Sequence, residues 1–339
     1  MKILVTGASG FIGNFFLAAL RDAGHEVRAA SRSRIERWGG DCVLAPELGP
    51  DADWGHALLG VDAVVHLAGR AHVPSKNADA ETEKIYFRIN TEGTRALAEQ
   101  AAAAGAKHFV FLSSCHAVAA ESEVQITEKT QSNPLTAYGR SKLEAERAAR
   151  KALSNTACAW TILRPPLVYG KGNNANFGLL LKLVKSGIPL PLASVRNRRS
   201  FIYVENLVGV IVACLGNPKA FGKTYLPSDG EDVSTPELIR KIAKANQSFQ
   251  FSEFSGPVVE AKVSGSTPAT RDSLLATPCN ARLFPFPESI LKALGRFPGL
   301  GALRKLTSSL YVDSEPLRKD LSWSPRLSME EGLVKTLGG

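Results

Sequence analysis

The sequence predicts an α/β protein with a Rossmann-type, doubly wound parallel sheet and a smaller C-terminal α/β lobe. Over the first 165 of its 339 residues, short β-branched runs alternate with longer amphipathic or Ala-rich runs. This alternation is typical of a parallel sheet that helices cover on both faces. Three glycines at every third position follow the first apolar run. Because the alternation breaks later in the chain, we expect one domain over 1–165 and a lobe over 166–339, some of whose elements return to the main sheet.

Each element of the first domain is indicated by its own residues. Strands are expected where β-branched and aromatic residues form short runs, and helices where apolar residues recur at helical spacing or alanine dominates. The expected strands are 2–6, 26–31, 41–45, 62–68, 107–114 and 157–165. The expected helices are 15–24, 80–105 and 137–153.

The lobe is less regular, because Pro and Gly are frequent and the strands are short. Helices are expected over 205–215 and 234–246. Residues 283–306 are both apolar and basic, which indicates an amphipathic helical pair. We favour packing of this pair on the lobe and keep contact with a membrane surface as the alternative.

Composition excludes several classes of protein. Apolar residues make up 44% and charged residues 22%, as in ordinary globular chains. No apolar run approaches the ~18 residues of a membrane span, and the N-terminus lacks the pattern of a signal peptide. The five cysteines lie far apart without metal-ligand spacing. We therefore expect a cytoplasmic protein with reduced thiols, no metal site and no membrane span.

The net charge of +9 raises the question of an anionic partner. Two separated groups of arginines fit two separate phosphate ligands. Few aromatic residues accompany them, so nucleic acid is not the expected partner. The two groups are Arg28, Arg32, Arg34 and Arg37 after the second expected strand, and Arg196, Arg198 and Arg199 in the lobe.

The glycine triplet lies where the first expected strand turns into the first helix. Its first glycine permits the tight turn, its second lets the backbone approach a phosphate, and its third lets the helix pack closely. The N-terminus of that helix directs free N–H groups at an anion. This context predicts an NAD(P)-binding domain over 1–165. The residues of the motif assigned to the dinucleotide are Gly7, Gly10, Phe11, Ile12 and Gly13.

The end of the second strand distinguishes NAD from NADP. A carboxylate there would bind the ribose diol of NAD, but this chain has Ser31, Arg32 and Arg34 and no acid. Hydroxyl and guanidinium groups suit the 2′-phosphate of NADP, so NADP(H) is expected and NAD(H) is the alternative. The alternative interpretation is that these arginines are exposed surface residues that bind no phosphate. Glu47 and Leu48, after the third strand, are assigned to the adenine.

A tyrosine and a lysine four residues apart supply the candidate chemistry. Tyr138 and Lys142 lie on one face of the expected helix, so both side chains address one site. A nearby ammonium is expected to lower the phenol pKa, so that the tyrosine exchanges a proton near neutral pH. Ser113 and Ser114 end the fifth strand, at the edge where open α/β sheets bind ligands. One of these hydroxyls then holds the reacting oxygen.

Several stretches in order resemble the extended short-chain dehydrogenase/reductase superfamily, in its nucleotide-sugar branch of NAD-dependent epimerases and dehydratases. They are TGASGFIG, VVHLAG, NTEGT, FLSS, YGRSK and LRPPLVYG, followed by RSFIYVENL and LSWSPRLSMEEGL. The resemblance implies a substrate-binding lobe, a homodimer through the helices around 80–104 and 137–153, and a catalytic set of Ser114, Tyr138 and Lys142. It assigns Ala68, Gly69, Asn90, Pro165 and Pro166 to the cofactor. It assigns Asn176, Phe177, Leu190, Pro191 and Arg199 to a UDP-sugar, with His116 and Arg271 as further candidates.

The chain departs from the dehydratase pattern. Dehydratases of this kind carry an Asp-Glu pair after the catalytic hydroxyl, where this chain has Cys115 and His116. His116 and His72 could contact the substrate, and the alternative for each is a histidine that is packed in the protein or exposed to solvent. The segments most resemble enzymes of UDP-N-acetylhexosamines in bacterial surface polysaccharides. We expect an NADPH-dependent 4-reductase of a UDP-4-keto-6-deoxy-N-acetylhexosamine, with an NAD-dependent 4-epimerase as the alternative. A non-catalytic dinucleotide sensor is disfavoured because Tyr138 and Lys142 are both present.

Overall fold

The computed structural model describes residues 1–36, 38, 42–71, 80–173, 176–253, 282–297 and 300–338. The chain divides into two compact units, each described by itself. The first comprises Met1–Val168, Ser200–Asp232 and Ser309–Arg326. The second comprises Tyr169–Arg199, Val233–Ser308 and Leu327–Gly339.

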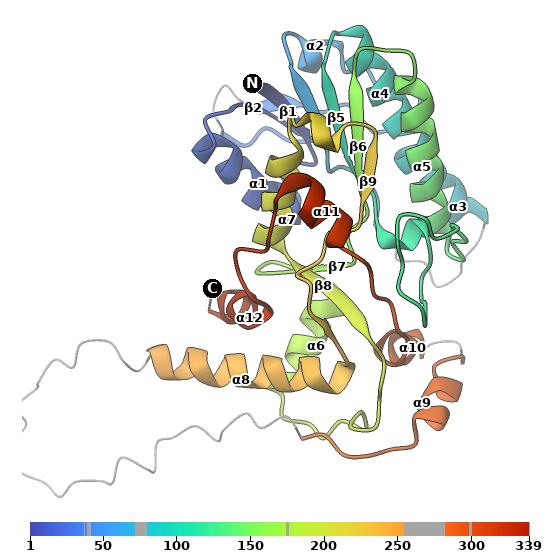
Figure 1. The fold of residues 1–339 in the computed structure, drawn as a ribbon, viewed down its shortest axis with the longest axis vertical. Coiled ribbons are helices and arrows are strands. Elements are labelled where there is room, and N and C mark those ends of the chain that lie inside the picture. Colours follow the sequence, from blue (N-terminus) through green and yellow to red (C-terminus); the bar gives the residue numbers. More distant parts are fainter. Residues whose placement is uncertain are drawn as a thin grey trace, which may run out of the picture. The chain divides into compact units, whose positions relative to one another are not determined.

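The first unit is built on a seven-stranded sheet of order β3-β2-β1-β4-β5-β6-β9, in which all neighbouring strands are parallel (Figure 1). The predicted parallel α/β fold is thereby confirmed, and all six expected strands are present. The seventh strand comes from the C-terminal half of the chain and pairs with β6. The strands are β1 (Lys2–Thr6), β2 (Glu26–Ser31), β3 (Cys42–Leu44), β4 (Ala63–His66), β5 (His108–Leu112), β6 (Ala159–Leu163) and β9 (Lys223–Tyr225).

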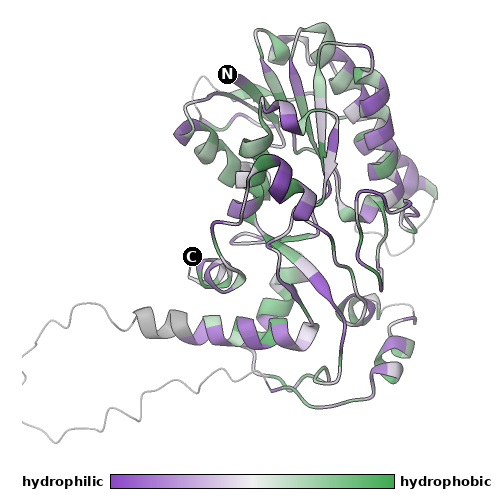
Figure 2. Cartoon of the chain, viewed as in Figure 1, coloured by the Kyte–Doolittle hydropathy of each residue, from purple (hydrophilic) through white to green (hydrophobic). Residues whose placement is uncertain are grey.

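Helices cover both faces of this sheet because the strands alternate apolar side chains to either side. Ile3 and Val5 of β1 belong to the core cluster under α1 and α7. Leu4, between them, belongs to the cluster under α4 and α5. Figure 2 shows hydrophobic strands at the centre of the unit and mixed surfaces on the helices. The helices of this unit are α1 (Phe11–Asp22), α2 (Gly55–Leu58), α3 (Ala80–Tyr86), α4 (Gly93–Ala103), α5 (Ala137–Leu153), α7 (Val204–Cys214) and α11 (Glu315–Leu321), with short 3₁₀ turns η3 (Cys115–Ala117) and η4 (Pro218–Ala220).

One expected helix differs from the prediction. The stretch 80–105 is not one α-helix, since a π-helical segment, η2 (Phe87–Glu92), separates α3 from α4. A π-segment inserts an extra residue per turn and often lies at a functional site. Here it carries Asn90, whose side chain is buried.

The second unit consists mainly of helices. α8 packs against α6 and α12, and α9 packs against α10. Its helices are α6 (Asn176–Lys185), α8 (Thr235–Glu253), α9 (Glu288–Leu294), α10 (Gly301–Thr307) and α12 (Met329–Leu337). Most residues of a separate three-stranded sheet belong instead to the first unit. This sheet has the order β10-β8-β7, formed by β10 (Asp232–Val233), β8 (Arg199–Tyr203) and β7 (Leu167–Tyr169).

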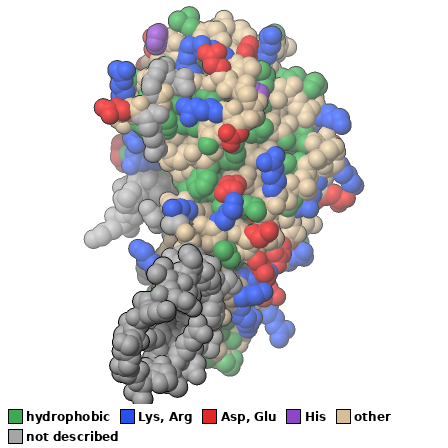
Figure 3. Space-filling model, turned by 90° about the vertical axis from the view of Figure 1, so that its left-hand side faces the viewer, with side chains coloured by type: hydrophobic (Ala, Val, Ile, Leu, Met, Phe, Trp, Pro, Cys, Tyr) green, Lys and Arg blue, Asp and Glu red, His purple; other side chains and the backbone are tan. Residues whose placement is uncertain are grey.

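Two surface properties bear on function. Among the described residues, no helix combines the length and the apolar character that crossing a bilayer requires. On the face drawn in Figure 3, lysine and arginine side chains are scattered and acidic side chains lie among them. That face therefore does not present one continuous basic tract of the kind that binds a nucleic-acid backbone.

Candidate active site

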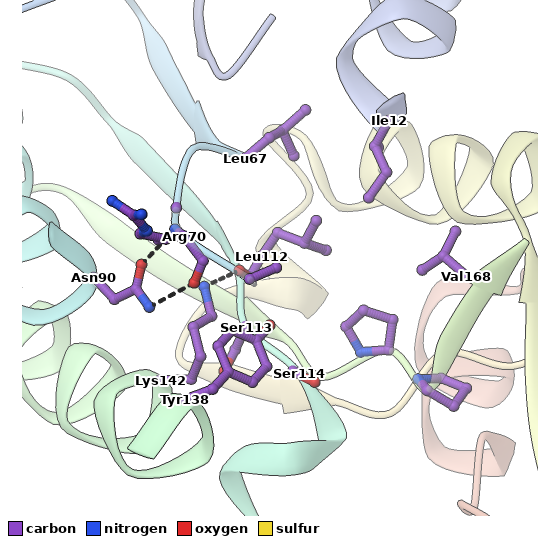
Figure 4. Close-up of a pocket in the computed structure, with 14 residues that line it drawn as sticks. Ile12, Leu67, Arg70, Asn90, Leu112, Ser113, Ser114, Tyr138, Lys142 and Val168 are labelled. Carbon is purple, nitrogen blue, oxygen red and sulfur yellow. Dashed lines mark hydrogen bonds between the residues drawn. The ribbon is translucent and has the colours of Figure 1, made fainter. Parts of the chain in front are cut away.

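A pocket opens at the carboxyl edge of the main sheet, entirely within the first unit (Figure 4). Parallel strands with matched registers end together at this edge, so residues distant in sequence meet there. It is lined by Ile12, Leu67, Gly69, Arg70, Ala71, Asn90, Leu112, Ser113, Ser114, Tyr138, Lys142, Pro165, Pro166 and Val168.

The glycine turn forms a cradle that a side chain would fill. Gly7 has a φ of +69°, and a Cβ there would lie 2.7 Å from the backbone nitrogen of Ala68. A Cβ at Gly13 would lie 2.4 Å from the carbonyl oxygen of Ala8. Gly10 is the N-cap of α1 and offers no side-chain cap, so it leaves the first-turn N–H groups uncovered. These residues fit a pyrophosphate group on the helix N-terminus.

The end of β2 presents a hydroxyl and two arginines. Ser31 is buried and donates a hydrogen bond from Oγ to Ser9 Oγ of the glycine turn, at 3.2 Å. Arg32 and Arg34 follow it and are both exposed. The hydroxyl therefore lies beside the phosphate cradle, and the two guanidinium groups are accessible.

The two residues assigned to the adenine have different environments. Glu47 is exposed. Leu48 is half-buried and packs against the core cluster under α4 and α5. Its Cβ lies 3.3 Å from the position that a Cβ on Gly93 would occupy, so α4 covers part of this side chain.

Tyr138 is placed by the first turn of α5. Thr136 is the N-cap of this helix and accepts a hydrogen bond from the Gly139 N–H at 3.0 Å. The Tyr138 and Ser114 side chains line the same pocket, and the Ser114 hydroxyl stabilises the ionised phenol. Ser114 Oγ also accepts from the His116 N–H at 3.2 Å, and the rings of His116 and Tyr138 lie 6.1 Å apart, edge to face. The structure therefore brings Ser114, His116 and Tyr138 together.

Lys142 lies one turn further along α5 and is buried. Its Nζ donates to the Leu112 carbonyl at the end of β5, at 2.7 Å, and lies 4.2 Å from the centroid of the Phe111 ring. Burial lowers the pKa of Lys142 to about 7, and the nearby carboxylate of Glu146 opposes this shift. The amino group of Lys142, held at the carboxyl end of β5, is thus available to the pocket and is only partly protonated near neutral pH.

The predicted lowering of the Tyr138 pKa is wrong in direction. Burial raises this pKa to about 12, and the Ser114 hydroxyl only partly opposes the shift. The sequence argument counted a neighbouring cation but not the removal of the phenol from water, which favours its neutral form. Tyr138 is consequently protonated at neutral pH, which is the form that donates a proton.

Asn90 connects the π-segment to this site. Its side chain accepts from the Arg70 N–H at 2.8 Å and donates to the Arg70 carbonyl at 3.1 Å and to Ser141 Oγ at 3.0 Å. A Cβ placed on Gly69 would lie 3.1 Å from Asn90 Oδ1 and 3.8 Å from Lys142 Nζ. Asn90 and Lys142 therefore flank the same short loop after β4, and a side chain at Gly69 would require Asn90 to shift slightly.

Sequence reasoning missed a buried network behind the catalytic candidates. Glu146 lies on α5 one turn after Lys142 and is fully buried. Its carboxylate accepts from Ser113 Oγ at 2.5 Å and from Arg164 at 2.9 and 2.6 Å. The spacing of four residues from Lys142 was an available signal for Glu146. No comparable signal marked Arg164, which immediately precedes Pro165.

A second missed residue is His66 at the end of β4. Its ring lies between the hydroxyl groups of Thr6, at 2.6 Å, and Thr94, at 3.1 Å, and stacks on Phe111. Burial, followed by the charge of Lys142, lowers its pKa to about 3. The imidazole is thus neutral, and it stacks on the same Phe111 ring that Lys142 contacts.

The residues assigned to the UDP-sugar lie in the second unit. Phe177 is buried and packs on Tyr169, with ring centroids 5.3 Å apart. Leu190 exchanges backbone hydrogen bonds with Arg282 and Phe284. Pro191, which follows Leu190, is half-buried. Asn176 begins α6. The predicted candidates Arg271 and His72 lie outside the described residues.

Arg199, the predicted partner of a diphosphate, is held by backbone oxygens. One of its terminal nitrogens donates to the carbonyls of Lys305 at 2.8 Å and Ser308 at 3.1 Å. These bonds orient the guanidinium at the start of β8. They engage one edge of a group with five N–H donors.

Comparisons with known proteins agree with this geometry. The family model described as "NAD dependent epimerase/dehydratase family" matches residues 3–226. The chain is 33% identical to a UDP-glucose 4-epimerase of Vibrio cholerae, over 99% of this chain and 94% of that protein. It is 28% identical to the N-acetyl-alpha-D-glucosaminyl-diphospho-ditrans,octacis-undecaprenol 4-epimerase of Escherichia coli O157:H7, over 72% of each chain.

Solved structures share the fold at lower sequence identity. A UDP-N-acetylglucosamine 4-epimerase from Bacillus cereus has a TM-score of 0.71 at 20% identity, over 99% of this chain and 98% of that one. MoeE5, in complex with UDP-glucuronic acid and NAD, has a TM-score of 0.70 at 21% identity, over the same shares of the two chains.

Proposed function

Because the chain belongs to the NAD dependent epimerase/dehydratase family, we propose that it is an NADPH-dependent reductase acting at C4 of a UDP-4-keto-6-deoxy-N-acetylhexosamine. The observation that carries this proposal is that Ser114 and Tyr138 line one pocket and that the Ser114 hydroxyl acts on the pKa of the phenol. Two hydroxyl groups at that position suit a carbonyl oxygen that becomes an alcohol. Lys142 and the glycine turn that would hold the cofactor complete the set of groups that this reaction needs.

The cofactor groove is supported by the glycine turn. Gly7 packs directly on the Ala68 backbone, with no room for a Cβ, and Gly10 places no side chain over the first turn of α1, so a ligand can approach the main chain there. The uncapped first turn of α1 would hold the pyrophosphate, and Pro165 and Pro166 would border the nicotinamide. When bound, this cofactor supplies or accepts a hydride at the sugar carbon.

The protein's own residues then handle the proton. Ser114 Oγ holds the carbonyl oxygen, and Tyr138 donates its hydroxyl proton to that oxygen as the ketone is reduced to the alcohol. Tyr138 is suited to donation because burial keeps its pKa high and the phenol neutral. Lys142, with a pKa near 7, lies one helical turn away and can return a proton to the site between turnovers.

The preference for NADPH rests on the end of β2. Ser31 lies beside the glycine turn, and the exposed guanidinium groups of Arg32 and Arg34 can pair with a 2′-phosphate. No carboxylate occupies this strand end to bind the ribose diol. A reductase must release its oxidised cofactor each turnover, which suits a freely exchanging NADPH.

A 4-epimerase is the second candidate, and it is favoured by the UDP-glucose 4-epimerase of Vibrio cholerae that matches nearly the whole chain. An epimerase would use the same hydroxyl pair twice: to remove the proton of the C4 hydroxyl group while C4 gives a hydride to bound NAD, and to return that proton when the hydride comes back to the other face of C4. Dehydration is disfavoured for this chain, because Cys115 and His116 follow Ser114 and neither supplies a carboxylic acid.

Two assays on the purified protein separate these functions. In the first, NADPH and a UDP-4-keto-6-deoxy-N-acetylhexosamine are mixed with enzyme, and absorbance of the reduced nicotinamide is followed. Stoichiometric consumption with formation of the 4-hydroxy sugar supports the reductase. In the second, UDP-N-acetylglucosamine is incubated with enzyme and NAD, and the sugar products are resolved by NMR. Conversion to UDP-N-acetylgalactosamine without NADPH consumption in the first assay would identify an epimerase instead.

A further inference from the structure

An apolar and basic edge of the second unit is not used by the proposed chemistry. It consists of the described residues 282–297 and 300–307, which include α9 and α10, and we call it the α9–α10 edge. Among the described residues, five of the thirteen exposed large hydrophobic side chains lie on it, with exposed fractions from 38% to 61%. These five are Phe284, Ile290, Leu294, Phe297 and Leu300. Such concentration within a short stretch indicates a contact surface rather than incidental exposure.

The edge is a folded scaffold that presents these side chains outward. Leu291 of α9 is buried, whereas Ile290 and Leu294, four residues apart, are exposed along one side of the same helix. α9 and α10 lie side by side (Figure 1). A Cβ on Gly295, which follows α9, would lie 2.8 Å from the Arg304 backbone nitrogen of α10, so the two helices approach closely. Inward packing is therefore satisfied, and the outward apolar side chains are additional to it.

Pairing with another segment fixes the start of the edge. The Phe284 N–H donates to the Leu190 carbonyl at 3.1 Å, and the Ala193 N–H donates to the Phe284 carbonyl at 3.2 Å. The backbone of Phe284 is thereby anchored while its side chain remains exposed. Ile188, two residues before Leu190, adds a further exposed apolar side chain near this pairing.

The charge of the edge is strongly positive. Its exposed basic residues outnumber its acidic residues by five to one within the described ranges. The single acid, Glu288, already pairs with Lys292 at 2.9 Å. Long basic side chains beside apolar ones can keep their charges at a phosphate layer while the apolar groups enter beneath it. The basic residues are Arg282, Lys292, Arg296, Arg304 and Lys305.

We propose that the α9–α10 edge docks the protein reversibly on the surface of an anionic lipid bilayer. Phe284, Ile290, Leu294, Phe297 and Leu300 enter the boundary between headgroups and acyl chains, and the basic side chains contact lipid phosphates. A second copy of the chain is a poorer occupant. An isologous contact would bring two positive edges together, and the single acid of each within the described ranges, Glu288, already pairs with Lys292.

The test uses the full-length protein and vesicles of defined composition. Sedimentation with phosphatidylcholine vesicles is compared with sedimentation with vesicles that also contain phosphatidylglycerol, at low and at high salt. The wild type is expected to bind the anionic vesicles and to lose binding as salt rises. The double variant Ile290→Ser/Phe297→Ser removes only exposed apolar groups and should bind at least about tenfold more weakly. Arg296→Glu should weaken binding to anionic vesicles in the same direction.

A matched control removes the same kind of side chain elsewhere. Leu59→Ser/Val124→Ser changes two side chains of the first unit that are 65% and 68% exposed, and it should bind vesicles as the wild type does. Absence of vesicle binding at low salt, or equal binding by both double variants, would overturn the proposal. A lower oligomer mass for Ile290→Ser/Phe297→Ser in light scattering would instead identify a contact between copies. None of these readouts depends on turnover, so their failure leaves the catalytic proposal intact.

Discussion

Glu146 and Arg164 form a bidentate ion pair in the interior of the first unit, with nitrogen–oxygen distances of 2.9 and 2.6 Å. Their side chains are 0% and 6% exposed. Glu146 lies on the helix that carries Tyr138 and Lys142, whereas Arg164 follows β6 and precedes Pro165. One carboxylate thus joins the catalytic helix to the carboxyl edge of the sheet.

Removing this carboxylate should lower stability strongly. In Glu146→Ala, the Arg164 guanidinium stays buried without its counter-charge, and Ser113 loses its acceptor. Breaking one partner of a buried pair costs about 3–5 kcal/mol, so we expect a decrease of that order in the free energy of unfolding by urea.

The same helix offers a matched control for this variant. Glu144 pairs with Arg147 at 2.6 Å, but both side chains are substantially exposed. Glu144→Ala should therefore change the unfolding free energy by less than about 1 kcal/mol. Equal losses in Glu144→Ala and Glu146→Ala would contradict a special role for the buried pair.

Tyr138→Phe should abolish turnover while leaving the fold and cofactor affinity nearly unchanged, because only the phenolic proton is removed. A loss of at least about a hundredfold in kcat is expected, measured in the reductase or epimerase assay. Tyr311→Phe is the control, since this hydroxyl donates to the Glu123 carbonyl at 3.2 Å and lies outside the pocket lining. If Tyr138→Phe retained the wild-type rate, another residue would have to supply the proton.

The sequence predicted the strongly patterned elements well. The bounds of β2 and α5 coincide with the expected 26–31 and 137–153, because strict alternation and helical spacing are local signals. The helical pair expected within 283–306 is likewise confirmed by α9 and α10. The glycine turn and the residues at strand ends could also be placed, since parallel strands bring their carboxyl ends to one edge.

Burial and long-range pairing could not be predicted from local pattern. Glu144 and Glu146 both precede an arginine on the same charged helix, yet only Glu146 faces inward to meet Arg164. The direction of the Tyr138 pKa shift was mispredicted for the same reason, because the degree of burial depends on the packed structure. The π-helical segment around Asn90 could not be predicted either, because the sequence there follows an ordinary helical pattern.

Arg32→Asp should shift cofactor preference from NADPH towards NADH. A carboxylate at the end of β2 repels a 2′-phosphate and can accept hydrogen bonds from a ribose diol. Losing one charge-assisted contact predicts a change of about tenfold to a hundredfold in the ratio of kcat/KM values for the two cofactors. Lys107→Asp makes the same charge change just before β5, at the end of the sheet where the strands begin. It should leave the ratio of kcat/KM values unaltered. An unaltered ratio in Arg32→Asp would show that this arginine does not contact the cofactor.

Lys142→Met should stabilise the protein in a pH-dependent way. Burial lowers the pKa of Lys142 to about 7 from its usual value of 10.5. The unfolded chain therefore holds an extra proton between these pH values, and wild-type stability rises with pH across that window. The variant lacks this dependence, so its advantage over the wild type should be largest at or below about pH 7 and shrink by on the order of 2 kcal/mol by pH 9. Urea unfolding of both proteins at several pH values measures the difference, and a difference that is constant with pH would contradict a buried, titrating ammonium.

Gly7→Ala tests whether the cradle needs an absent side chain rather than only an unusual backbone. Gly7 and Gly24 both have positive φ, at +69° and +74°, but a Cβ at Gly24 would meet nothing within 4 Å. Gly24→Ala should therefore lose only about 1–2 kcal/mol of stability, because an alanine is strained in the left-handed conformation. Gly7→Ala adds a contact of 2.7 Å with the Ala68 backbone, so it should unfold more readily and gain less stability from added NADP(H) than Gly24→Ala does. Thermal unfolding with and without the dinucleotide reports both effects, and matching behaviour of the two variants would mean that the close packing of Gly7 on Ala68 does not shape the binding site.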